Sequence, residues 1–444
     1  MTPVHAGQPE PGRTGVLVRL TAGWQDSDQA ASLHEHVRRF GQLPPVHDGR
    51  VAGHRLTEMV SAAGLTGRGG AGFPTGTKMR SVAARRGPAI VVANGMESEP
   101  ASEKDQALLA RAPHLVLDGI ELAAAAVGAN AAYLCMSRSR DWLTDIVLDA
   151  ISQRQHAGVD RMPVEVHELP HNYVSSEETS LVHWLNGGDA RPTATPPRPF
   201  ERGVRKRPTL VDNVETLAHI ALIARYGADW FARAGHADMP GTMLTTVTGA
   251  VADPGVYEVG GGTRIGDVLM AARASADIGA VLVGGYFGTW HPISEVAALP
   301  FARAGLDRAG GAPGAGVLFA LPAGACGLTE AARILRYLAG ESAQQCGPCM
   351  FGLPAIASDL SQLAAGRPDG DPLDRLQRRF RQISGRGGCR HPDGAVRMAA
   401  SALRAFAADV HVHARRRPCI AAHRGQRITG PLPVPPAPTE GGWR

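Results

Sequence analysis

The chain has 444 residues but few aromatic side chains, 5% of the total, and only six cysteines. It has no apolar run of the roughly 18 residues that a membrane-spanning helix needs. Residues 1–30 lack the apolar core and cleavage-like site of a secretory signal, so we expect a cytoplasmic protein without a disulfide framework. No stripe of basic residues interleaved with aromatics is present, which argues against nucleic-acid binding.

Glycine (54) and proline (33) are plentiful, and at about 150 residues per domain the length predicts about three domains. The changes in texture along the chain divide it into five parts. These are a lead-in at 1–55, an α/β domain at 56–240, a small β-rich domain of the ubiquitin-like kind at 241–325, a helical bundle at 326–415 and a Pro-rich tail at 416–444 that we expect to be disordered.

Apolar strand-like runs alternate with helical periodicity in the first half, and this predicts a mainly parallel sheet. The strands expected there are 15–20, 89–93 and 131–136, and the helices are 30–40, 108–127 and 143–153. The β-rich part is expected to have strands at 242–249, 254–259 and 280–285 with a helix at 265–274, and the bundle to have helices at 330–338, 353–363, 374–383 and 394–410.

Cys346 and Cys349 are three residues apart, and Cys389 follows in a Gly-rich segment. Ferredoxin-type iron–sulfur sites space their thiolates as C-x2-C-x2-C, so this set resembles a cluster site with one ligand missing, at Ala343. His391, Ser342 and Cys326 are candidates for the fourth ligand. Zinc on the three cysteines plus His391 is the alternative, because three thiolates and one imidazole form a legitimate tetrahedral set.

A glycine-rich loop runs from Gly67 to Lys78, and its bare amides can approach a phosphate or a flavin ring closely. The strand at 89–93 leads into Glu97 and Glu99. Since ligands of open α/β folds bind at the carboxyl edge of the sheet, we expect these carboxylates to face a pocket there.

The glycine loop, Asn94–Pro100 with Lys104-Asp105, Tyr173–Thr179 and Arg207–Thr216 follow one another in a specific order. Over about residues 56–406 the chain resembles the flavin-bearing, NADH-oxidising subunit of respiratory complex I and the related flavin subunits of hydrogenases and formate dehydrogenases. The resemblance implies an FMN/NADH-binding α/β domain, a soluble-ligand-binding β-grasp (SLBB-like) domain and a helical domain with a [4Fe–4S] cluster.

The resemblance also implies roles for single residues. Catalytic carboxylates would be Glu97 beside the flavin and Glu99 and Glu178 at the nicotinamide. The cofactor-binding residues would be Gly67, Arg68, Gly69, Gly70 and Lys78 around the phosphates, Phe73 on the adenine, and Asn94, Ser98, Tyr173, Glu177, Asn213 and Thr216 around FMN. Three positions depart from the family pattern: Met96 replaces an acidic residue, Ser176 a glycine and Ser81 an aromatic residue.

We therefore expect an enzyme that takes hydride from NADH onto FMN and passes single electrons through a [4Fe–4S] centre, ligated by Cys346, Cys349 and Cys389, to a partner. The partner would be a ferredoxin-like or other redox subunit, and the location cytoplasmic or peripheral to a membrane complex. Two alternatives are a non-enzymatic assembly or scaffold protein that has lost a productive cluster and a diaphorase that uses flavin alone.

Overall fold

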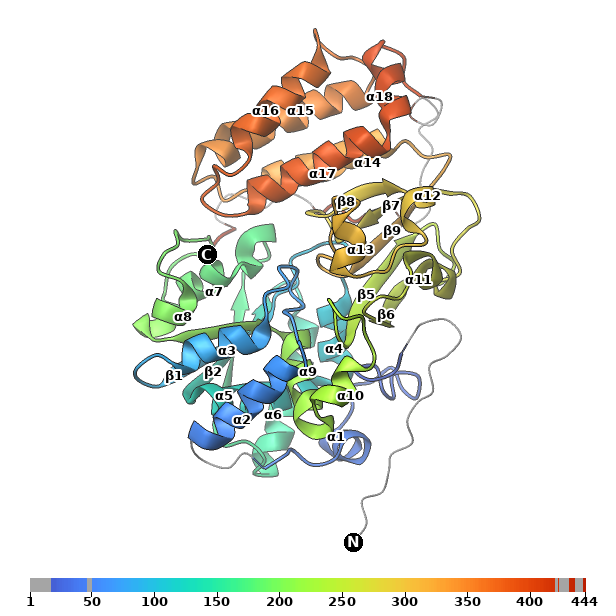
Figure 1. Ribbon diagram of the computed structural model, residues 1–444. Helices are drawn as coiled ribbons and strands as arrows, with labels where there is room; N and C mark the ends of the chain where they lie inside the picture. The colour runs from blue at the N-terminus through green and yellow to red at the C-terminus, as the bar shows by residue number, and fades with distance from the viewer. Residues whose placement is uncertain (1–16, 46–49, 420–421, 423–430, 436–441) are drawn as a thin grey trace.

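The structure is a computed structural model that describes residues 17–45, 50–419, 422, 431–435 and 442–444. Figure 1 shows three parts: an α/β unit, a small β unit beside it, and a helical bundle that caps both. The strand expected at 15–20 is wrong for the described residues 17–20, which form coil and a turn. Only one backbone hydrogen bond, from Leu17 N to Glu258 O at 2.8 Å, joins residue 17 to the neighbouring sheet.

The α/β unit contains a four-stranded parallel sheet in the order β3-β2-β1-β4. Its strands are β1 (Ala89–Gly95), β2 (Ala129–Ser137), β3 (Val164–Leu169) and β4 (Thr209–Asn213). The chain builds outward from β1 to β3 and then returns to add β4 on the other side of β1. The direction of winding thus reverses between β1 and β4, and the crevice at their carboxyl ends is where such folds bind ligands.

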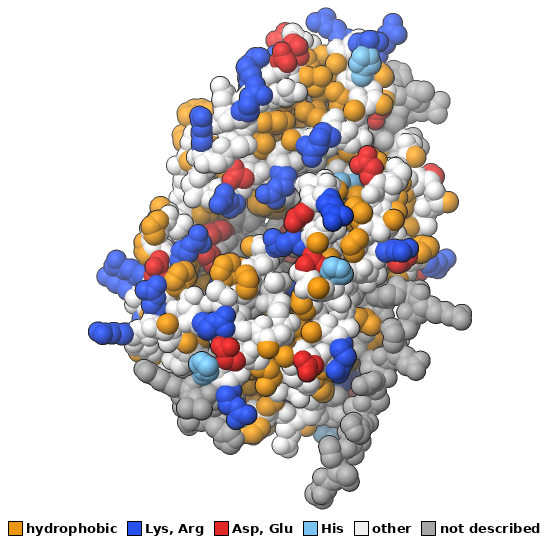
Figure 2. Space-filling view, in the orientation of Figure 1, with side chains coloured by type: hydrophobic (Ala, Val, Ile, Leu, Met, Phe, Trp, Pro, Cys, Tyr) orange, Lys and Arg blue, Asp and Glu red, His pale blue; other side chains and the backbone are white. Residues whose placement is uncertain are grey.

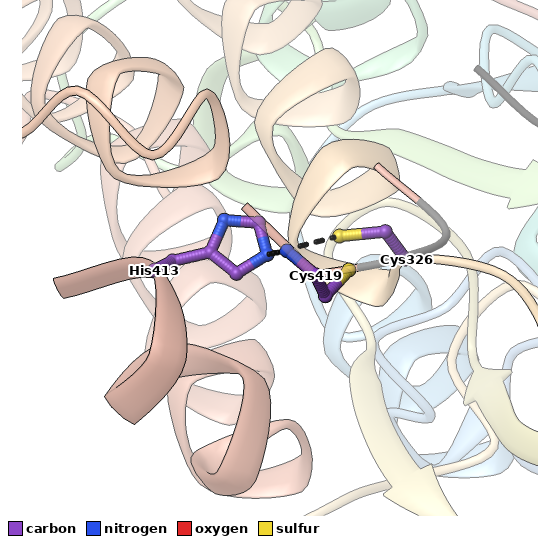
Figure 3. A group of neighbouring side chains, drawn as sticks. All are labelled: Cys326, His413 and Cys419. Atoms are coloured by element: carbon purple, nitrogen blue, oxygen red, sulfur yellow. Dashed lines mark hydrogen bonds between the residues drawn. The ribbon is translucent and has the colours of Figure 1, made fainter. Parts of the chain in front are cut away.

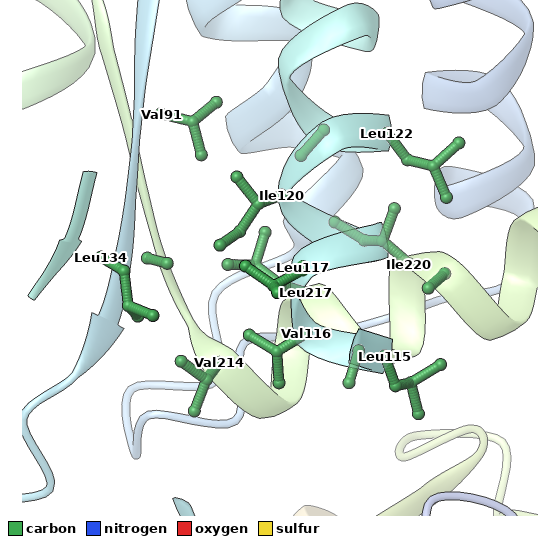
Figure 4. Packing of buried hydrophobic residues seen from close by; sticks show 14 of the residues in the cluster. Val91, Leu115, Val116, Leu117, Ile120, Leu122, Leu134, Val214, Leu217 and Ile220 are labelled. Atoms are coloured by element: carbon green, nitrogen blue, oxygen red, sulfur yellow. The ribbon is translucent and has the colours of Figure 1, made fainter. Parts of the chain in front are cut away.

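Alternate residues of the strands supply the two faces of this sheet, as the period of two requires. Val91 and Ala93 face α5 (Pro113–Val127) and α9 (Val214–Tyr226), whereas Ile90 and Val92 pack with residues of α7 (Glu178–Leu185) on the opposite face. Figure 4 shows the first of these layers, with Leu117 and Ile120 of α5 packed among Val214, Leu217 and Ile220 of α9.

The single helix expected at 108–127 is two helices, α4 (Lys104–Arg111) and α5. Pro113 has no N–H and disfavours helical geometry in the residue before it, and Ala112 leaves the helix with φ −136° and ψ 50°. The other described helices of this unit are α1 (Leu33–Phe40), α2 (Arg50–Ala62), α3 (Thr75–Ala83), α6 (Asp141–His156), η1 (Tyr173–Ser176), α8 (Pro199–Arg202), η2 (Val204–Lys206) and α10 (Ala228–Ala232).

The β unit is a five-stranded mixed sheet in the order β6-β5-β9-β7-β8. Its elements are β5 (Thr242–Gly249), β6 (Gly255–Gly260), α11 (Ile265–Ala271), β7 (Ile278–Val283), β8 (Thr289–Pro292), α12 (Ile293–Val296), α13 (Arg303–Asp307) and β9 (Val317–Pro322). The three expected strands and the expected helix are present, while β8 and β9 were not expected. β9 lies between β5 and β7, parallel to the first and antiparallel to the second.

The bundle consists of α14 (Gly327–Gly340), α15 (Leu353–Ala364), α16 (Pro372–Ile383), α17 (His391–Ala405) and α18 (Ala407–Ala414), with a π-helical turn, η3 (Pro348–Gly352), before α15. The helix expected at 394–410 is divided between α17 and α18, because Phe406 leaves helical geometry and packs its ring against Gly327 and Trp290. In the described part of the chain no helix is long and apolar enough to cross a lipid bilayer.

The tail was expected to be disordered, but parts of its described residues pack against the rest of the protein. Leu432 is 1% exposed, and its carbonyl oxygen accepts a hydrogen bond from Arg333 of α14 at 3.0 Å. The carbonyl oxygen of Trp443 accepts one from Ala190 N at 3.0 Å. For residues 420–421, 423–430 and 436–441 the prediction of disorder falls outside the described residues.

Candidate functional site

A cavity of about 760 Å³ opens at the carboxyl ends of β1 and β4. Its walls come from all three parts of the molecule, and Figure 2 shows acidic and basic side chains around a hollow below the bundle. Of the predicted site residues, those that line it are Arg68, Gly69, Gly70, Asn94, Glu97, Ser98, Glu99, Tyr173, Glu177, Asn213 and Cys389.

The glycine loop is held open toward this cavity by hydrogen bonds at its base. Gly67 N donates to Phe73 O at 2.9 Å, and Arg68 N donates to the hydroxyl oxygen of Thr216 at 2.9 Å. The guanidinium of Arg68 turns away and donates to the carbonyl oxygens of Thr242 and Pro240. Within the described residues the backbone N–H groups of Gly69 and Gly70 have no acceptor, so two amide donors remain on the cavity wall.

Glu97 lies in the cavity wall, but its carboxylate serves the adjacent helix. It accepts hydrogen bonds from Asp105 N at 2.8 Å and Gln106 N at 2.9 Å, the first amides of α4, and from the Ser102 hydroxyl at 2.8 Å. This is the role of a helix N-cap, and the residue adopts a left-handed φ of 38° to reach it. Glu97 therefore shapes the wall, and its oxygens are already bonded.

Glu99 is the carboxylate with the unusual environment. It accepts hydrogen bonds from the Tyr173 hydroxyl at 2.7 Å and from Tyr286 N at 2.9 Å. Burial raises the pKa of Glu99 to about 7, although these hydrogen bonds oppose the rise. A carboxyl that exchanges its proton near neutral pH thus sits where the β unit meets the sheet.

A buried charge network forms the floor of the crevice, and its central cation, Lys104, belongs to the Lys104-Asp105 motif of the sequence. Lys104 Nζ lies 2.6 Å from Asp105, 2.9 Å from Glu215 and 3.2 Å from the amide oxygen of Asn213. Although burial alone would lower the pKa of Lys104, these carboxylates raise it above its usual value. Despite its own burial, Glu215 has its pKa lowered to about 2, mainly by Lys104. The network fixes α4 to α9 beneath the cavity.

Hydrogen bonds also connect the cavity with the cysteine segment. Tyr173 N donates to the carboxylate of Glu341 at 2.8 Å, and Glu341 is two residues before Ala343. Burial raises the pKa of Glu341 to about 6, while this bond opposes the rise. The Tyr173 ring packs edge-on against Phe287 and His391, both of which line the cavity.

The polar residues around Tyr173 hold one another in place. Ser98 donates to Tyr173 O at 2.6 Å and shares a short hydrogen bond with Ser176. Asn94 Nδ2 donates to Ser176 O at 2.8 Å. Glu177 caps α7 by accepting from Thr179 N at 2.8 Å. Burial raises the pKa of Glu177.

Five of the residues predicted for the flavin and dinucleotide site lie outside the cavity wall. Thr216 and Gly67 support the loop from behind, and Phe73 is 53% exposed. Lys78 forms ion pairs of 3.5 Å with Glu178 and Asp212, so its charge and that of Glu178 are already matched.

The three departures from the family pattern have distinct settings. Met96 is fully buried in the apolar cluster on the α7 face of the sheet, so its side chain is not beside the cavity. The hydroxyl of Ser81 donates to Thr77 O within its own helix at 2.9 Å. Ser176 alone lines the cavity.

Sequence reasoning missed the walls that the β unit and α17 contribute. These are Gly284, Phe287, Gly288, Thr289, Arg303, Asp307, Gly310–Ala312, Gly314, Ala315, Arg390 and Arg397. Only the density of glycines signalled them: Gly284, Gly310 and Gly314 have positive φ, and an added Cβ at Gly314 would lie 2.4 Å from Gly284 O.

The three predicted ligand cysteines come together at the base of the bundle. Cys346 lies just before η3 and Cys349 within it, their thiols are hydrogen-bonding neighbours, and Cys389 lies two residues before the start of α17. Burial, together with the neighbouring sulfurs of Cys346 and Cys389, raises the pKa of Cys349 far above its usual value. Such crowding of thiols favours a bound cation, which removes their protons.

The three candidates for a fourth ligand are not equivalent. Cys326 lies near His413 and Cys419 instead. Ser342 Oγ and His391 Nδ1 are both buried and have no hydrogen-bond partner among the described residues. His391 Nε2 lies 2.7 Å from Leu338 O and so carries the proton, which leaves the lone pair on Nδ1.

The fold and the site together define an α/β protein whose crevice, of the kind that binds dinucleotides, lies beside a group of cysteines. Three family models match: the Nuo51 FMN-binding domain over residues 60–222, the SLBB domain over 244–281 and the iron–sulfur binding region of NADH-ubiquinone oxidoreductase-F over 329–413. These ranges fall inside the predicted α/β, β-grasp and helical domains, whose boundaries remain predictions.

Relatives match over nearly the whole chain. The second NADH-quinone oxidoreductase F-type subunit of Rhizobium meliloti (strain 1021) is 30% identical over 385 residues, 82% of this chain and 90% of the relative. The corresponding F-type protein of Streptomyces coelicolor (strain ATCC BAA-471 / A3(2) / M145) is 30% identical over 419 residues, 90% of this chain and 92% of the relative. The chain belongs to this family of F-type NADH-quinone oxidoreductase subunits, as its motifs indicated.

Among solved structures, the NAD⁺-reducing [NiFe]-hydrogenase in its air-oxidized state matches with a TM-score of 0.79 and 31% sequence identity. The match covers 89% of this chain and 66% of that one, so the chain spans about two thirds of the hydrogenase chain. The predicted fold class, with an FMN-binding α/β domain, an SLBB domain and a C-terminal iron–sulfur region, is confirmed.

The residues present fit both groups that the family binds. The free amides of Gly69 and Gly70 suit a phosphate, and the left-handed φ of 106° at Gly70 is one that favours glycine. At the cysteine site, three crowded thiols and two unpartnered polar atoms suit a cluster held by three thiolates and one further ligand.

Proposed function

We propose that this chain is an NADH-oxidising flavoprotein that takes hydride from NADH onto FMN and passes single electrons through a [4Fe–4S] cluster to a redox partner. One observation carries the proposal: Cys389 lies in the wall of the same cavity as Gly69, Gly70 and Glu99. A flavin in the cavity and a cluster on Cys389 would therefore be neighbours. Membership of the family does not favour the non-enzymatic alternative.

Within this proposal, Gly69 and Gly70 bind the flavin phosphate through their amides, and Asn94, Ser98, Tyr173, Glu177 and Asn213 form the pocket around the ring and ribityl chain. FMN, when bound, supplies the conversion between two-electron and one-electron chemistry. Glu97 positions α4 and thereby the wall. Glu99 holds a proton near neutral pH at the junction with the β unit. Phe73, Lys78 and Glu178 form the dinucleotide side of the site, at its rim.

The cluster ligands in this proposal are Cys346, Cys349 and Cys389, with Ser342 or His391 in the fourth position. His391 presents a free lone pair on Nδ1, and its backbone N–H donates to the Cys389 thiol. The partner in this proposal is a ferredoxin-like or other redox subunit, and the naming of relatives as subunits supports the presence of a partner. A location in the cytoplasm or at the periphery of a membrane complex belongs to the same proposal.

Visible spectroscopy of protein purified without oxygen tests the proposal. We expect a flavin band, a broad iron–sulfur absorbance, and bleaching of both when NADH is added. Yellow, iron-free protein that NADH still reduces would restrict the function to a flavin diaphorase. Protein without flavin and without stoichiometric iron would overturn the proposal.

A further inference from the structure

A second group of potential metal ligands lies at the far end of the bundle from the cysteines already described. The sulfurs of Cys326 and Cys419 and a ring nitrogen of His413 all lie within 4.8 Å of one another. Figure 3 shows the two cysteines converging on the imidazole of His413. The three residues come from separate segments: Cys326 precedes α14, His413 lies in α18, and Cys419 follows α18.

The imidazole of His413 is held in the tautomer that a metal requires. Its Nδ1 lies 3.1 Å from the carbonyl oxygen of Leu363 and so carries the proton. Its Nε2 accepts a hydrogen bond from Cys419 N at 3.0 Å and lies 3.9 Å from Cys326 Sγ, so the lone pair faces the sulfurs. A backbone carbonyl behind the opposite nitrogen is the usual support of a metal-binding histidine.

Both sulfurs also receive hydrogen bonds. The backbone N–H and the hydroxyl of Thr329 donate to Cys326 and oppose the rise of its pKa to about 11 that burial causes, and Ala422 N donates to Cys419 Sγ at 3.4 Å. His413 is fully buried and Cys326 is 6% exposed, while Cys419 is partly exposed. The group is thus enclosed on two sides and reached by solvent on the third.

We propose that Cys326, His413 and Cys419 bind a divalent metal ion of the zinc class, separate from the iron–sulfur site. Two thiolates and one neutral imidazole are a ligand set that zinc prefers, and a water molecule on the open side of Cys419 would complete a tetrahedron. The ion would replace the hydrogen bond between Cys419 N and His413 Nε2. Nothing in the flavin or cluster chemistry uses these residues.

The site acts as a clamp on the bundle. Cys326 is where the chain enters α14, and Cys419 is where it leaves α18, so one ion would join the two ends of the helical domain. Because an ion that binds only the folded state stabilises it by mass action, its removal lowers the melting temperature.

Metal analysis of the full chain, purified with its flavin and iron, tests the proposal. We expect about one zinc per chain in the wild type and a loss of that zinc in Cys326→Ser and Cys419→Ser, with iron content unchanged. Cys135→Ala is the matched control, because Cys135 is a buried cysteine of β2 far from the group in sequence and outside it in space. It should keep the zinc.

The absorption spectrum of Co²⁺-substituted protein identifies the ligands directly. Protein reconstituted with Co²⁺ alone, minus the same protein with Zn²⁺, should show a thiolate-to-cobalt charge-transfer band that weakens in Cys419→Ser and His413→Gln. The subtraction removes the flavin and cluster absorbance. Absence of bound zinc and of this band, equal zinc in the variants and the wild type, or recovery of Cys326 and Cys419 as a disulfide would each overturn the proposal.

Discussion

Glu97 and Glu99 are two residues apart, yet their different hydrogen-bond partners give them different roles in the crevice. Glu97 turns its carboxylate into the amides that begin α4, whereas the buried carboxylate of Glu99 accepts from a tyrosine hydroxyl and from the backbone amides of Tyr286 and Ala101. The first caps a helix, and the second is a carboxyl whose proton is available near neutral pH. The sequence predicted both as catalytic carboxylates, since it carries no sign of the left-handed backbone at Glu97.

The raised pKa of Glu99 makes stability depend on pH in a definite direction. The folded protein holds this proton up to pH about 7, whereas an ordinary glutamate releases it near 4.5. The folded state therefore binds more protons than the unfolded state between these values, and stability falls as pH rises through them. The contribution is at most about 3 kcal/mol.

Glu99→Gln, which imitates the protonated acid, should match the wild type at pH 5 and exceed its melting temperature at pH 8, measured on flavin-free protein. Glu103→Gln, an exposed glutamate on the same segment, is the control and should change the melting temperature little. An equal difference between Glu99→Gln and the wild type at both pH values would show that Glu99 does not titrate in this range.

Ala343 is the residue at which the cysteine pattern is incomplete. It is 5% exposed and follows Ser342, whose hydroxyl has no partner among the described residues. Ala343→Cys should raise the iron content and slow the loss of iron in air, because a fourth thiolate replaces a weaker ligand. Iron assays and the decay of cluster absorbance measure both effects.

Ala357→Cys, a buried alanine-to-cysteine change on α15, controls for the added thiol. Iron content and lability that stay the same in Ala343→Cys would indicate that position 343 is not the vacant ligand site.

At the scale of elements, the sequence predicted best those site residues that directly follow a strand. β1 and the segment after it were placed correctly because an apolar strand ending in polar residues has few other meanings in an α/β sheet. The loops of the β unit were not foreseen as cavity walls, since Gly284–Phe287 and Gly310–Ala315 reach the cavity only through tertiary packing. The helix boundaries at Pro113 and Phe406 were also not predicted, because each depends on a single residue.

The loop between β7 and β8 gives a prediction at this scale. Gly285 has φ 86°, and a Cβ there would lie 2.7 Å from the Glu99 carboxylate. Gly285→Ala should therefore displace Glu99, cost about 1–3 kcal/mol of stability and weaken flavin retention.

Gly255→Ala is the matched control, because a Cβ at Gly255 in β6 meets nothing within 4 Å. Flavin titration and thermal melting compare the two variants. If Gly285→Ala retained flavin as well as Gly255→Ala, the close approach of this loop to Glu99 would not matter for the pocket.

For the whole molecule, the described parts of the tail join the three units that share the cavity. Tyr286 of the β unit donates a short hydrogen bond to Pro433 O, Arg333 of the bundle bonds to Leu432 O, and Arg191 of the α/β unit lies 4.9 Å from the Trp443 ring centroid. Proline-rich composition predicted disorder here, because composition does not reveal that a single leucine finds an apolar site in another domain. Under the proposed function, these contacts would set the relative position of flavin and cluster.

Substitutions at Leu432 and Val434 test whether packing of the tail against the bundle holds the units together. Leu432 is 1% exposed and Val434 is 37% exposed. Leu432→Ala should lower stability by about 2–4 kcal/mol and slow the bleaching of the iron–sulfur absorbance by NADH relative to that of the flavin band, because the bundle loosens from the other units. Val434→Ala should change stability by less than about 0.5 kcal/mol and leave both rates unchanged. Thermal melting and anaerobic stopped-flow spectroscopy measure the two effects, and identical behaviour of the two variants would mean that the tail does not hold the units together.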